Sequence, residues 1–171
     1  MTPRTKLVIQ TVGTCAGFGG LIGAITNMVN GVVSPLYFKT IMRWDNVENI
    51  MGAAVTQGIF EGLIQGILFS AIFASVVGVK SNDDEKYFTV LKFISTISLI
   101  IVGAWTVGGL IAIGLSLLSP EFYRSAFIGV PEEFKEMEKY AWVGGSIWGA
   151  MFGGLLTVIL GSVVYAKKRR S

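Results

Sequence analysis

Long apolar segments alternate with short polar segments along this chain of 171 residues. Four of the apolar segments are long enough for a transmembrane helix, which needs about 20 mostly apolar residues. The segments between them are too short to form a separate soluble domain. The pattern therefore predicts an all-α, polytopic membrane protein with four transmembrane helices. The predicted spans cover residues 7–33, 53–79, 88–118 and 141–166.

Composition and charge agree with this prediction. Hydrophobic residues make up 52% of the chain and charged residues only 15%, which is more apolar than an ordinary soluble domain. The N-terminal segment, the turn between the second and third spans, and the C-terminal segment together carry nine of the 14 lysines and arginines. By the positive-inside rule these three segments are cytoplasmic. We therefore expect a multi-pass protein of the cell (plasma or inner) membrane, with both termini in the cytoplasm and no nucleic-acid partner.

The two halves of the chain show similar motifs in the same order. The sequence Gly-Gly-Leu-Ile at residues 19–22 recurs at residues 108–111, and Ser-Pro at residues 34–35 recurs at residues 119–120. We interpret the halves as two copies of one helix-loop-helix unit. Both copies begin on the same side of the membrane, so the repeats are predicted to be parallel. The predicted units are residues 1–80 and 81–171.

The Ser-Pro motifs predict where the first and third spans end, because proline is common just past the last turn of a helix. Beyond Pro35 and Pro120, aromatic and apolar residues alternate with basic ones. Such segments are typical of short amphipathic helices at the level of the lipid headgroups. A docking face for a partner outside the cell is the alternative interpretation.

Glycines recur at every fourth residue in the second and fourth spans. On a helix this spacing, a glycine zipper, leaves a ridge without side chains, along which a second helix backbone can come close. We expect the ridges to pack on the first and third spans or on each other, with contact between subunits as the alternative. The predicted helix-packing residues are Gly58, Gly62, Gly66, Gly145, Gly149 and Gly153.

A polar ridge of Gln57, Glu61 and Gln65 lies beside the glycines of the second span. A carboxyl group in an apolar span is costly and often functional, so these residues form the candidate intramembrane polar site. Three hypotheses are open for Glu61. In the first, it is protonated or hydrogen-bonded, for example to Gln57, Gln65, Thr56 or a polar group such as Asn27 or Asn30, and it holds helices together. In the second it is a proton or cation site, and in the third it pairs with a basic residue of a partner subunit.

Residue usage argues against most catalytic chemistry. The chain has no histidine and one cysteine, which removes most zinc sites, the usual general base and an internal disulfide. We therefore predict no enzyme activity, no metal and no cofactor.

The expected function is that of a small non-enzymatic packing or accessory subunit of a membrane complex, or of a homo-oligomer held through the glycine ridges. The alternative is a small-solute or ion transporter or channel, with Glu61 as a proton or cation site. The expected partners are the lipid bilayer and either other membrane subunits or further copies of this chain.

Overall fold

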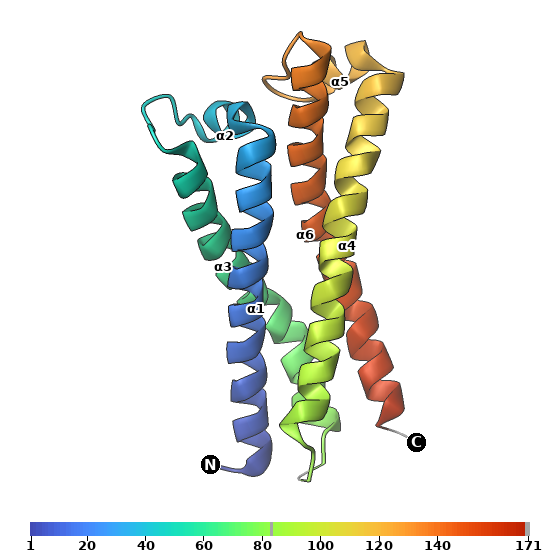
Figure 1. Ribbon diagram of the computed structural model, residues 1–171. Coiled ribbons are helices and arrows are strands. Elements are labelled where there is room, and N and C mark those ends of the chain that lie inside the picture. Colours follow the sequence, from blue (N-terminus) through green and yellow to red (C-terminus); the bar gives the residue numbers. More distant parts are fainter. Residues whose placement is uncertain (83, 170–171) are drawn as a thin grey trace.

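The computed structural model describes residues 1–82 and 84–169 and contains four long helices (Figure 1). All four are long and apolar enough to cross a membrane. This confirms the predicted all-helical class with four apolar helices of spanning length, as in a multi-pass membrane protein. The long helices are α1 (Pro3–Val33), α3 (Ile50–Lys80), α4 (Tyr87–Leu118) and α6 (Phe134–Lys168).

Two short helices, α2 (Pro35–Met42) and α5 (Pro120–Ala126), follow α1 and α4. Each begins at the proline of a Ser-Pro motif, because proline lacks the N–H that the first helical turn leaves unbonded. Ser34 lies between α1 and α2, and its side chain accepts a hydrogen bond from the Tyr37 amide (3.3 Å). The two predicted short helices are thus confirmed. Both lie at one end of the molecule, here called the short-helix end, and the chain termini lie at the opposite, terminal end (Figure 1).

The last long helix extends beyond the predicted apolar span. We expected the apolar span to begin near residue 141, with the acidic residues before it forming a solvated helical turn that leads into the span. Helix α6 begins at Phe134 and contains Glu136 and Glu138 of that turn. Its first turns contain Glu136 and Lys139, which form an ion pair one turn apart (2.6 Å). Hydropathy reports only the part of a helix that suits lipid, so polar turns that continue the same helix escape it.

The long helices associate as two pairs. Helix α1 packs along α3 and helix α4 packs along α6, while contacts between the pairs are fewer and run mainly between α3 and α6 and between α1 and α4. In Figure 1, α3 crosses behind α1, and the two pairs stand side by side. Each half of the chain therefore has the order long helix, short helix, long helix. The interpretation of the two halves as structural repeats stays a prediction.

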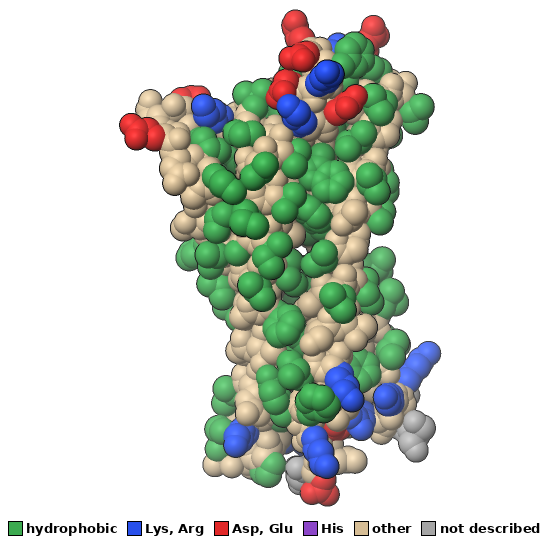
Figure 2. Space-filling model, in the orientation of Figure 1, with side chains coloured by type: hydrophobic (Ala, Val, Ile, Leu, Met, Phe, Trp, Pro, Cys, Tyr) green, Lys and Arg blue, Asp and Glu red, His purple; other side chains and the backbone are tan. Residues whose placement is uncertain are grey.

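On the face of the bundle shown in Figure 2, apolar side chains cover the middle and charged side chains gather at the ends. Large apolar side chains such as Leu99 and Phe60 are exposed, at 73% and 66%. Such a surface would be a liability in water, but it suits contact with lipid acyl chains.

A buried cluster at the terminal end joins the two halves of the chain. Phe73 and Val77 of α3 pack with Val90 of α4 and with Tyr165 of α6. The Tyr165 hydroxyl is hydrogen-bonded to the Ser81 hydroxyl (2.6 Å), and both residues are buried. Aromatic packing and a satisfied polar pair thus hold α3, α4 and α6 together at this end.

This polar pair predicts a measurable coupling between Ser81 and Tyr165. Ser81→Ala or Tyr165→Phe leaves one buried hydroxyl without its partner, so we expect each variant to lose about 1–3 kcal/mol of unfolding free energy. The double variant should lose little more than either single variant, because both hydroxyls are then gone. Unfolding of the purified protein in mixed micelles measures this, and additive losses would contradict the pairing.

Candidate functional site

The glycines of α3 lie directly against the backbone of α1. A Cβ atom at Gly62 would overlap the carbonyl oxygen of Gly19, and one at Gly58 would overlap that of Gly23. Gly66 meets the backbone at Cys15 in the same way. These three positions leave no room for a side chain, so the two helices touch through their main chains.

The glycines of α6 pack on α4. A Cβ atom at Gly145 or Gly149 would overlap the backbone of Gly108 or Ala104, and one at Gly153 would collide with the Ala104 methyl group. The structure therefore brings each ridge against the preceding long helix of its own half, and the ridges do not pack on each other. Because the ridges are occupied within the chain, they are not free surfaces for another subunit.

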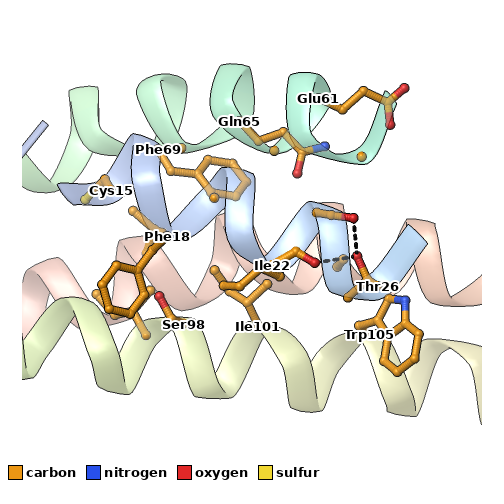
Figure 3. A pocket seen from close by; sticks show the side chains of 18 of the residues that line it. Cys15, Phe18, Ile22, Thr26, Glu61, Gln65, Phe69, Ser98, Ile101 and Trp105 are labelled. Atoms are coloured by element: carbon orange, nitrogen blue, oxygen red, sulfur yellow. Dashed lines mark hydrogen bonds between the residues drawn. The ribbon is translucent and has the colours of Figure 1, made fainter. Parts of the chain in front are cut away.

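The polar ridge of α3 is divided between two environments. Gln57 Nε2 donates a hydrogen bond to Glu61 Oε1 (2.7 Å) on the exposed side of the helix. Gln65 is half-buried and extends toward α1, whereas the Glu61 carboxylate extends away from it along α3 (Figure 3). The three predicted residues are therefore not one cluster.

The hydrogen bond of Glu61 stays within α3. Among the described residues Glu61 bonds to Gln57 alone, which confirms one of its expected partners. The expected bonds to Gln65, Thr56, Asn27 or Asn30 are not formed. The reason is geometric, since the face of α3 that meets α1 is the glycine ridge, and Glu61 lies on its flank. Burial raises the pKa of Tyr37 in α2, and the negative charge of Glu61 adds to this rise.

A cavity of about 100 Å³ lies between the four long helices, bordered by both ridges of α3 (Figure 3). Phe18, Phe69 and Ile101 form part of its apolar wall. Among the described residues that line it, Glu61 is the one with a charged side chain. The other polar groups on it are neutral: Thr26, Asn27, Asn30, Gln65, Ser98 and Trp105.

Two buried donors at this cavity have no hydrogen-bond partner within the described residues. Asn30 is fully buried and its Oδ1 accepts a hydrogen bond from Ser146 of α6 (3.2 Å), but its Nδ2 is unpaired. The indole Nε1 of Trp105 is unpaired as well. The sequence singled out Asn30 only as a possible partner of Glu61. It did not single out Trp105 or Ser146, because the sequence of one apolar span does not show which of its residues face a cavity between helices.

No protein family, curated protein or solved structure matches this chain. Among the described residues, no group of three or more Cys, Asp and Glu side chains is placed to hold a metal ion. The site is therefore a set of hydrogen-bonding groups and one carboxylate between helices in close contact.

The main-chain contact at Gly62 predicts a large effect of one methyl group. Gly62→Ala places a Cβ on the Gly19 carbonyl and should force α1 and α3 apart, so we expect a clear loss of thermal stability and of monodisperse protein in detergent. Gly103→Ala is the matched control, because a Cβ there meets no atom within 4 Å. It should be neutral or stabilising by up to about 1 kcal/mol through helix propensity. Equal tolerance of both changes would contradict the contact.

Proposed function

We propose that this protein is a small non-enzymatic membrane subunit that associates laterally, with itself or with another membrane protein. The association surface is the flank of α3 that carries Gln57 and Glu61. One observation carries the proposal: a carboxylate is exposed in the middle of a helix of membrane-spanning length.

The depth of Glu61 supports this proposal. Helix α3 has 31 residues, so it is about 46 Å long, and Glu61 lies about 16 Å from its start at 1.5 Å per residue. A hydrocarbon core about 30 Å thick, centred on this helix, would contain the Glu61 carboxylate. The neighbours Phe60 and Ile64 are exposed and apolar, as expected of a surface in lipid.

An uncovered carboxylate at that depth is costly, at about 2.5 kcal/mol or more. Within the described residues its one hydrogen bond comes from the neutral amide of Gln57, and the ion pairs lie elsewhere, at Glu136 and Glu85. A partner helix that supplies a donor or a basic side chain would lower this cost. The close packing of the glycine ridges is consistent with this association, because it holds α3 rigidly against α1 and so fixes the position of the flank that carries Glu61.

The test is the size and composition of the native particle in nanodiscs. We expect more than one chain per particle, either identical chains or a co-purifying protein. Glu61→Leu should weaken association about 3- to 20-fold, the range that one interhelical hydrogen bond in a membrane provides. Glu61→Gln keeps a hydrogen-bonding group and should be nearly silent. Leu99→Ala, an exposed change on α4, is the control, and a monomeric native particle without other chains would refute the proposal.

A second candidate function is transport, which the cavity between the four long helices favours. Glu61 borders this cavity and can change between a charged and a neutral state, as the proton or cation site of a small transporter does. If so, Glu61→Gln should abolish proton or cation flux into proteoliposomes while leaving folding and assembly intact. Flux that persists in this variant at the native rate would exclude Glu61 from such a role.

A further inference from the structure

The cavity contains hydrogen-bonding groups that the protein itself does not satisfy. The amide Nδ2 of Asn30 and the indole Nε1 of Trp105 are buried donors that have no acceptor among the described residues, and both residues line the cavity. Leaving such a donor unpaired is unfavourable, because it loses its hydrogen bond to water and gains none in the protein. One donor belongs to α1 and the other to α4, and both residues border the same cavity. An oxygen acceptor inside the cavity would satisfy them.

Apart from Glu61, the described residues that line the cavity are uncharged. The described lining contains no lysine or arginine, so an anion would find no counter-charge. Its one acid, Glu61, directs its carboxylate away from the other lining side chains, while Gln65 points among them (Figure 3). A cation inside would therefore lie apart from the carboxylate, and burying an unpaired charge is far more costly than burying a neutral polar group.

The size and lining of the cavity limit which solutes fit inside it. An apolar cavity of about 150 Å³ accommodates benzene, so one of about 100 Å³ suits a solute of about four or five non-hydrogen atoms. Much of the lining is apolar, including Phe18 of α1 and Ile101 of α4, the two helices that also carry the unpaired donors (Figure 3). Such a mixture of apolar wall and few polar groups is typical of small-molecule sites.

We propose that this cavity is a binding site for a small uncharged organic solute that carries a carbonyl or hydroxyl oxygen. The solute oxygen accepts hydrogen bonds from Asn30 and Trp105, and its apolar part lies against Phe18 and Ile101. This site does not depend on the association proposed above, because all of its groups belong to one chain.

Trp105 serves as the reporter of this site. The probe is acrylamide, a small neutral amide that quenches indole fluorescence on contact, and the signal is the difference between native protein and Trp105→Phe. Acetamide, acetate and acetamidinium have nearly the same shape but are neutral, anionic and cationic. We expect acrylamide to quench Trp105, acetamide to protect it in a saturable way, and the two ions to protect it several-fold less.

Single-residue variants test whether the protection by acetamide comes from binding in this cavity. Asn30→Leu removes the unpaired amide and should weaken protection by acetamide several-fold, whereas Asn46→Leu, at an exposed loop position, should not. Ala150→Leu, which fills the cavity from α6, should abolish quenching. If these variants fold poorly, the comparison of acetamide, acetate and acetamidinium on the unaltered protein still tests whether the cavity binds a neutral solute in preference to an ion.

Three results would overturn the proposal. Equal protection by acetamidinium would mean a cation site, and equal protection by acetate an anion site. A Trp105 signal that acrylamide cannot quench would mean that the cavity admits no organic solute. A monomeric particle in the nanodisc experiment would refute the association but leave this site unaffected.

Discussion

Contact between main chains inside each helix pair is the constraint on which the rest of the structure depends. In lipid, apolar side chains gain little by meeting each other, so helices associate through close van der Waals packing and hydrogen bonds. Gly58 and Gly62 on α3, and Gly145 and Gly149 on α6, allow this by leaving no side chain between the backbones. The four-helix bundle is therefore two tight pairs joined by looser contacts.

The position of the polar residues on α3 follows from this contact. Because the glycine ridge must face α1, residues beside it are turned to the flanks of the helix. Gln57 and Glu61 consequently meet on the exposed side, where they bond to each other, and Gln65 borders the cavity. A polar flank on a rigid pair gives a partner helix a fixed surface to recognise, which is the basis of the proposed association.

The cavity reflects the weaker contact between the pairs. Where α1 and α3 approach α4 and α6, side chains rather than backbones meet, and Phe18, Phe69 and Ile101 leave space between them. The hydrogen bond between Asn30 and Ser146 crosses from one pair to the other at this level. It orients the Asn30 amide while leaving its Nδ2 unpaired, so the same residue both links the pairs and offers a donor to a solute.

Hydropathy alone determined the four long helices, and the Ser-Pro motifs determined α2 and α5, because both depend on residues close together in the chain. The four-residue period likewise determined which glycines share a face. Only the tertiary structure decided which helix each ridge meets, that Glu61 bonds within α3, and that Asn30 and Trp105 border one cavity. These outcomes depend on how separate helices rotate and cross against one another, which the spacing of residues along one helix does not specify.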